Sequence, residues 1–193
     1  MGNQSGKIST KEVNFLTMHT IFEKEEIKSF YREFLNNWPD GYMDLQTFTD
    51  FLRGFFNGDM ESFAEHYFRN IDKDKTGKIN FKEFLLYLSS EGSTNPFERI
   101  TWLFDLFDVD GNGEITKKEM VEIFKSALTL TREDTEDPDS TAATITEEIF
   151  QRYDRNKTNT LNKFEFQDAF LERPETFLRF PVLYNYIFNV RIQ

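Results

Sequence analysis

Oxygen-bearing side chains recur at fixed spacing in the segments 72–83, 108–119 and 154–165, which we call loops 2, 3 and 4. In each loop, positions 1, 3 and 5 are Asp, Asn or Thr, position 8 is aliphatic and position 12 is Glu. Ca²⁺ takes about six or seven hard oxygen ligands, and a calcium loop of about twelve residues delivers them from positions 1, 3, 5, 7, 9 and 12. The side-chain types and their spacing therefore predict calcium binding.

Loop 3 satisfies the complete calcium-loop motif, with Gly113 at the sharp turn of position 6. Loop 2 departs from the motif only at position 5, where the hydroxyl of Thr76 replaces an Asp or Asn. We expect both loops to bind Ca²⁺. The predicted ligands are Asp72, Asp74, Thr76, the Lys78 carbonyl, Asn80 and Glu83 in loop 2, and Asp108, Asp110, Asn112, the Glu114 carbonyl, Thr116 and Glu119 in loop 3.

Loop 4 is a weaker candidate. Its position 6 is Asn159, the next best residue after Gly for a left-handed backbone, so the turn survives at some cost. Only two of its ligands are acidic, and ligand charge helps to set affinity. We expect loop 4 to be the last site to fill. Its predicted ligands are Asp154, Asn156, Thr158, the Thr160 carbonyl, Asn162 and Glu165.

A degenerate copy of the loop lies at 36–47 and is called loop 1. It keeps Gly41 at position 6 and an aliphatic Met43 at position 8, but position 12 is Thr47, so the bidentate Glu is missing. We expect loop 1 to be empty, which gives two to three Ca²⁺ for the whole chain. Whether Mg²⁺ occupies one loop at rest stays open.

Amphipathic segments flank every loop. Their apolar residues recur at three- and four-residue spacing, as in Ile100, Leu103, Phe104 and Phe107 before loop 3, and this spacing predicts helices with one apolar face. The predicted fold class is therefore all-α, with four EF-hand helix–loop–helix units in two paired lobes. An aliphatic residue at position 8 of each loop is expected to let the loops pair back to back.

Two polar segments interrupt this pattern. The segment 89–95 divides the chain into an N-terminal EF-hand pair at 1–90 and a C-terminal pair with an apolar C-terminal helix at 95–193. Asn95 and Pro96 are typical of an N-cap followed by the first helical position. The acidic segment 131–144 is expected to be a mobile surface insert.

Composition excludes several function classes. Asp and Glu number 34 against 23 Lys and Arg, so the net charge of −11 argues against nucleic-acid binding. The chain has no cysteine, which excludes disulfides, thiolate metal sites and cysteine nucleophiles, and makes the cytoplasm the default location. Since no phosphate loop, nucleophile elbow or catalytic triad signature occurs, we do not expect an enzyme.

The N-terminus is close to an N-myristoylation signal with Gly2 as the acylated residue, although Gly6 occupies the position where Ser or Thr is preferred. An ordinary polar terminus is the alternative. A single myristoyl chain binds membranes only marginally, so a membrane-associated protein would need a second contact, for which Lys7, Lys11 and the target are candidates.

The N-terminal pair carries more large apolar residues than its own core needs. Calcium opens sensor helix pairs, and the apolar groove so exposed can accept a helix of a target protein. The tail from Phe177 to Val190 is expected either to occupy this groove at rest or to pack as a last helix on the second half. The predicted groove residues are Phe30, Phe34, Phe48, Phe51, Phe55, Phe56, Phe68, Phe84, Leu85 and Leu88.

Four such units, a Met-Gly terminus and a disrupted first loop resemble the neuronal calcium sensor family (the recoverin, visinin-like, frequenin and guanylate-cyclase-activator group). That family has a Cys-Pro-x-Gly disruption, and this chain reads Trp38-Pro39-Asp40-Gly41. The resemblance implies a myristoylated cytosolic sensor whose N-terminal pair forms a groove for a target helix. Trp38 in place of Cys, the insert and the aromatic tail are departures from the better-known members.

The leading hypothesis is a calcium sensor that regulates a membrane-associated enzyme, channel or receptor. A calcium buffer, which barely opens on binding, is the first alternative. The second is a constitutive subunit of an enzyme or channel that holds its partner regardless of calcium. The sequence does not name the target or the oligomeric state.

Overall fold

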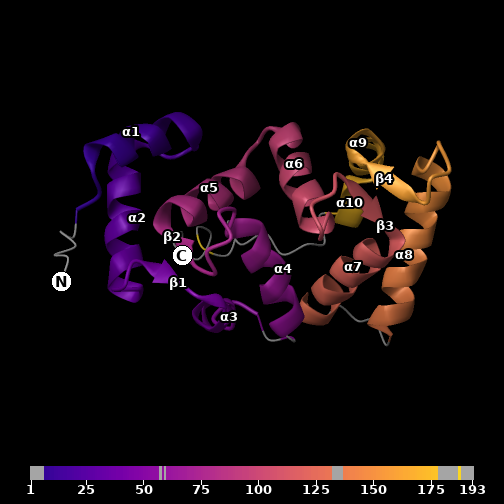
Figure 1. Cartoon of the computed structure of the whole chain (residues 1–193), viewed down its shortest axis with the longest axis horizontal. Helices are drawn as coiled ribbons and strands as arrows, with labels where there is room; N and C mark the ends of the chain where they lie inside the picture. The colour runs from indigo at the N-terminus through magenta and orange to yellow at the C-terminus, as the bar shows by residue number, and fades with distance from the viewer. Residues whose placement is uncertain (1–6, 57, 59, 132–136, 178–186, 188–193) are drawn as a thin grey trace.

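The computed structural model describes residues 7–56, 58, 60–131, 137–177 and 187 (Figure 1). The first two units contain α1 (Thr10–His19), α2 (Lys24–Asn37), β1 (Tyr42–Met43), α3 (Leu45–Leu52), α4 (Glu61–Ile71), β2 (Ile79–Asn80) and α5 (Phe81–Gly92). The second two contain α6 (Pro96–Phe107), β3 (Glu114–Thr116), α7 (Lys117–Thr131), α8 (Pro138–Tyr153), β4 (Thr160–Asn162), α9 (Lys163–Glu172) and α10 (Pro174–Phe177). The predicted fold class is confirmed.

The loops pair through two short antiparallel sheets, β1 with β2 and β3 with β4. Met43 lies opposite Ile79, and Ile115 lies opposite Leu161. These four residues occupy position 8 of their loops, and each is 0% exposed. The expected back-to-back pairing is confirmed, and it joins the two units of each lobe beneath their loops.

The end of a loop is also the start of the helix that follows it. In α5, the side chain of Asn80 accepts a hydrogen bond from the N–H of Glu83, and the Glu83 carboxylate reaches back to the N–H of Asn80. Asn162 and Glu165 form the same capping box at α9. Positions 9 and 12 thus fix the helix start as well as supplying metal ligands, because a capping box satisfies two otherwise unpaired N–H groups.

The predicted insert at 131–144 is largely wrong. Thr131 ends α7, and residues 138–144 form the first turns of α8; residues 132–136 lie outside the described part. Asp137 caps α8 by accepting a hydrogen bond from the N–H of Ser140, and Pro138 takes the first helical position. An Asp-Pro pair marks a helix start as readily as a turn, and the acidic composition masked this signal.

Two other boundaries differ from expectation. The predicted break at 89–95 shortens to residues 93–95, because α5 continues to Gly92. The helix α1 was not predicted. It begins with a capping box between Ser9 and Glu12 and packs Val13 and Leu16 into the core, against α2 and α5. The Ser-x-x-Glu spacing is the sequence signal that would have found it.

The two lobes meet along α4, which packs against α6 and α7 (Figure 1). His66 of α4 is buried at this contact, with its Nε2 3.4 Å from Glu122 Oε1 on α7. Burial lowers the pKa of His66, the neighbouring Arg69 lowers it further, and Glu122 partly opposes both effects. The histidine is therefore held in its neutral form.

Replacing His66 by Gln is expected to reduce the fall in the free energy of unfolding that acid pH causes. Because the pKa of His66 is lower in the folded protein than its ordinary value of 6.5, the unfolded chain binds the proton more tightly. The free energy of unfolding therefore falls as the pH drops through 6.5 toward the lower folded pKa. Urea unfolding in chelator at about pH 7.5 and about pH 5.5 measures this loss. His19→Gln, at an exposed histidine, is the control. If the free energy of unfolding falls as much in His66→Gln as in His19→Gln, the prediction is contradicted.

Candidate metal centres

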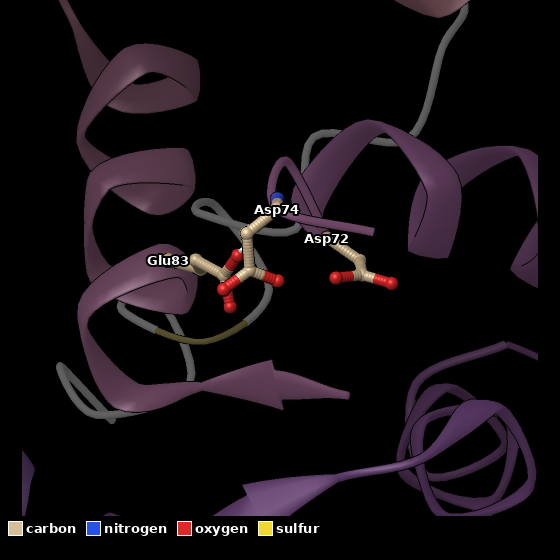
Figure 2. A group of neighbouring side chains, drawn as sticks. All are labelled: Asp72, Asp74 and Glu83. Atoms are coloured by element: carbon tan, nitrogen blue, oxygen red, sulfur yellow. Dashed lines mark hydrogen bonds between the residues drawn. The ribbon is translucent and has the colours of Figure 1, made fainter. Parts of the chain in front are cut away.

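Two clusters of three carboxylates lie in loops 2 and 3. In each cluster, one oxygen from each residue lies within 4.8 Å of the others. Figure 2 shows the cluster of loop 2, with Asp72 at the end of α4, Asp74 in the turn and Glu83 in the first turn of α5. Like charges held this close repel one another, and a divalent cation with oxygen ligands relieves that repulsion. The corresponding residues of loop 3 are Asp108, Asp110 and Glu119.

Backbone hydrogen bonds hold the first carboxylate in place in loops 2, 3 and 4. It accepts the N–H groups of positions 5 and 6, which folds the turn around it. The distances are 3.0 and 2.8 Å for Asp72 from Thr76 and Gly77, 3.1 and 2.9 Å for Asp108 from Asn112 and Gly113, and 3.0 and 2.9 Å for Asp154 from Thr158 and Asn159. The three loops therefore share one internal geometry.

Burial raises the pKa of the Glu83 carboxyl. The N–H groups of Asn80 and Asp74 oppose this shift, whereas the charges of Asp74 and Asp72 add to it. The position-12 carboxylate thus carries a cost in desolvation and repulsion that a bound cation would offset. This electrostatic environment fits a calcium site.

Left-handed backbone occurs at two positions of each predicted loop. Position 6 was expected, and Asn159 takes it with φ 61° beside 75° for Gly77 and 87° for Gly113. Position 4 was missed: Lys75, Gly111 and Lys157 have φ of 57°, 73° and 58°. Loop 1 has Pro39 at position 4, and the proline ring fixes φ near about −65°. Loop 1 is thus barred from the calcium-loop turn by its backbone as well as by the missing Glu.

Loop 4 keeps the geometry with less charge. The amide oxygen of Asn156 accepts the N–H of Thr158 at 3.1 Å, as the Asp at position 3 does in loops 2 and 3. The carboxylate of Glu165 accepts the N–H of Asn162 at 3.1 Å. Since only Asp154 and Glu165 are acidic, loop 4 remains a proposed third and weaker site.

The predicted groove residues divide into two groups. Four do not line the cavity between α2, α3 and α5: Phe48, Phe56 and Phe68, which are 0%, 6% and 8% exposed, and Phe55, which is half-buried. The other six line a cavity of about 90 Å³ between α2, α3 and α5: Phe30, Phe34, Phe51, Phe84, Leu85 and Leu88.

Three further apolar residues line this cavity and were not among the predicted groove residues: Trp38, Phe81 and Ile187. The Trp38 ring lies 4.9 Å from the Phe34 ring, between centroids, and 5.3 Å from that of Phe51. It therefore forms part of the groove wall, which the interpretation of Trp38 as a loop disruption overlooked. Ile187 belongs to the apolar tail, for which occupation of the groove was one of the two expected positions.

The predicted acylation site Gly2 lies outside the described residues. Among the helices of the described part, none combines the length and apolar character that crossing a membrane requires.

Comparison with known proteins agrees with this geometry. Models of the EF-hand domain pair match residues 61–91 and 97–171. The chain is 34% identical to human recoverin over 183 residues, which cover 91% of this chain and 90% of recoverin. It is 34% identical to neuronal calcium sensor 1 of Lymnaea stagnalis over 177 residues, or 90% and 93% of the two chains. The chain belongs to the neuronal calcium sensor family.

A third member of the neuronal calcium sensor family, the calcium-binding protein NCSA of Dictyostelium discoideum, is 36% identical over 130 residues, or 67% of this chain and 69% of NCSA. The family and the two carboxylate clusters together identify Ca²⁺ as the metal that the loops are built for. The expected resemblance is confirmed, and no catalytic family is indicated.

Proposed function

We propose that this protein is a calcium sensor that binds two to three Ca²⁺ through loops 2, 3 and 4 and regulates a membrane-associated target protein through its N-terminal groove. One observation carries the proposal. Glu83, the position-12 residue of loop 2, is followed directly on α5 by the groove residues Phe84, Leu85 and Leu88. A movement of Glu83 on calcium binding would therefore move α5, which forms one wall of the groove.

The coupling follows from the fold. In EF-hand sensors, binding at the loop reorients the two helices that flank it. In this chain the helix after loop 2 is α5, and its Phe84 ring lies 6.0 Å from the Phe34 ring of α2 and 5.8 Å from the Phe51 ring of α3, between centroids. Rotation of α5 would separate these rings and widen a cavity that measures only about 90 Å³. The groove would then accept a target helix.

Two described residues of the apolar tail contact different lobes. Ile187 lines the groove, whereas Phe177 is 2% exposed and packs on Phe107 and Phe166 in the C-terminal lobe. Both alternatives for the tail thus have a described residue in their favour. The rest of the predicted tail, 178–186 and 188–190, lies outside the described residues. We propose that Ile187 shields the groove until a target displaces it.

The domain boundaries and location complete the proposal. The proposed N-terminal pair extends to the end of α5 at Gly92, two residues beyond the expected boundary at 90, and the proposed C-terminal pair covers 95–193. The protein is proposed to be cytoplasmic and to reach membranes through an acyl group on Gly2. Lys7 or Lys11 would supply the second contact that a single chain needs.

Binding of an apolar fluorescent dye tests this function against its alternatives. The sensor is expected to bind much more dye in calcium than in chelator, because the groove widens. A buffer would bind little dye in both conditions, since its helices barely reorient. A constitutive subunit would bind equal amounts of dye in both, since its groove stays open.

A further inference from the structure

Arg69 joins the second calcium loop to the third. It lies on α4, three residues before Asp72, the first residue of loop 2. Its guanidinium donates hydrogen bonds to two carbonyl oxygens of the other lobe, that of Leu106 at 2.7 Å and that of Val109 at 2.8 Å. Leu106 belongs to the last turn of α6, and Val109 is the second residue of loop 3.

The two acceptors explain why an arginine fits this place. Carbonyl groups in the last turn of a helix lack partners within the helix, and a cation there also complements the helix dipole. The planar guanidinium presents its donors in a fixed fork, so one side chain reaches both carbonyls. The charges of Asp108 and Glu119, both predicted ligands of loop 3, attract it further.

The peptide group of Val109 connects Arg69 to the calcium site of loop 3. Its N–H donates to Glu119 Oε1 at 3.0 Å, while its C=O accepts from Arg69. Glu119 is the position-12 residue, whose two oxygens grip the ion in a calcium loop. A shift of Glu119 on binding therefore alters the peptide that Arg69 holds.

Neighbouring side chains make the connection stiff. The amide Nδ2 of Asn70 donates to the Trp102 carbonyl at 3.2 Å, and Lys73 Nζ lies 2.9 Å from Asp105 Oδ2. The C-terminal end of α4 is thus tied to α6, and Figure 1 shows α4 on the side of the N-terminal lobe that faces α7. Reorientation of α4 by loop 2 must be transmitted to the start of loop 3.

We propose that Arg69 is a positioning residue that couples the two loops, so that occupation of loop 3 raises the calcium affinity of loop 2. Linkage requires the reverse effect to have the same size. This inference rests on the proposed function, because both loops must bind Ca²⁺. Couplings between sites are typically about 5- to 150-fold, and we expect about 5- to 20-fold here.

Nuclear magnetic resonance of the glycine amides reports each loop separately. The N–H of Gly77 donates to Asp72 at 2.8 Å and that of Gly113 to Asp108 at 2.9 Å, so each resonance follows its own loop. Glu119→Gln disables loop 3, and the Gly77 resonance then gives the calcium affinity of loop 2. The same comparison in the Arg69→Gln background completes a double-mutant cycle.

With Arg69 present, Glu119→Gln is expected to weaken calcium binding in loop 2 by about 5- to 20-fold. In the Arg69→Gln background the same change is expected to weaken it less than about twofold. Arg69→Lys keeps the charge but not the fork, and should give an intermediate coupling; it also serves if Arg69→Gln fails to fold. Arg53→Gln is the matched control with full coupling, because Arg53 pairs with Asp50 and Glu61 inside its own lobe.

Undiminished coupling in Arg69→Gln and Arg69→Lys would overturn the inference, as would independent binding of the two loops in the unsubstituted protein. A failure of the proposed function has a different signature. In that case neither Gly77 nor Gly113 would respond to calcium in the unsubstituted protein.

Discussion

Glu119→Gln is expected to remove at least half of the thermal stabilisation that calcium gives to loops 2 and 3, because it disables loop 3 and weakens binding in loop 2. Sensor loops bind with dissociation constants of about 10⁻⁷ to 10⁻⁵ M. At about 1 mM free calcium each occupied loop then stabilises the folded protein by about 3–5 kcal/mol. For a chain of this size that raises the unfolding midpoint by roughly 10 °C per loop. The difference between calcium and chelator in a melting experiment measures the loss.

The effect is large because Glu119 is buried and held in place at the point where loop 3 closes. It is 8% exposed, and its oxygens accept hydrogen bonds from the N–H groups of Val109 at 3.0 Å and Thr116 at 2.8 Å. Gln keeps the size of the side chain but replaces one anionic oxygen with an amide that repels a cation. The bidentate carboxylate that closes a calcium loop is then lost.

Glu114→Gln is the matched control in the same loop. It makes the same change of charge, but position 7 supplies only its backbone carbonyl to the ion, and the Glu114 carboxylate instead accepts a hydrogen bond from Thr160 at 3.0 Å. Its calcium-dependent rise in melting temperature should be close to that of the unsubstituted protein. Equal losses in Glu114→Gln and Glu119→Gln would contradict the assigned ligand set.

Phe107→Ala is expected to lower the free energy of unfolding by about 3–5 kcal/mol, as large-to-small changes at buried aromatic sites do. Phe107 is 0% exposed, and its ring centroid lies 5.2 Å from that of Phe124, 5.5 Å from Phe166 and 6.1 Å from Phe177. Removing the ring leaves a cavity where α6, α7, α9 and α10 meet. Urea unfolding in chelator measures the cost without a contribution from calcium.

Phe164→Ala is the control for Phe107→Ala, because it removes the same ring from a position that is 79% exposed. Substitutions at such surface positions usually change stability by less than about 0.5 kcal/mol. Comparable losses in the two variants would show that the C-terminal core is not centred on Phe107.

The loops could be predicted because a calcium loop is written in consecutive residues. The ligand positions, the turn at Gly113 and the aliphatic Ile115 all fall within one segment of loop 3. The pairing of Ile115 with Leu161 then followed, because an aliphatic residue at the same loop position recurs in every copy. The left-handed Lys75 and Lys157 were missed, since lysine has no preference for that conformation and the surrounding fold imposes it.

What the sequence did not predict depends on contacts between distant segments. Phe48 and Phe51 lie three residues apart on α3, yet Phe48 is in the core and Phe51 lines the groove. Composition cannot separate the two, because the choice depends on where α2 and α5 pack. The role of Arg69 likewise has no signal in the sequence, because its carbonyl partners lie 37 and 40 residues away.

A dye titration tests the central claim most directly, namely that calcium in loop 2 opens the groove. The fluorescence of an apolar dye is compared in calcium and in chelator for the unsubstituted protein and for Glu83→Gln. We expect a strong calcium-dependent rise in the unsubstituted protein and a much smaller one in Glu83→Gln, since Glu83 links the loop to α5. Dye binding that calcium leaves unchanged in the unsubstituted protein would contradict the account.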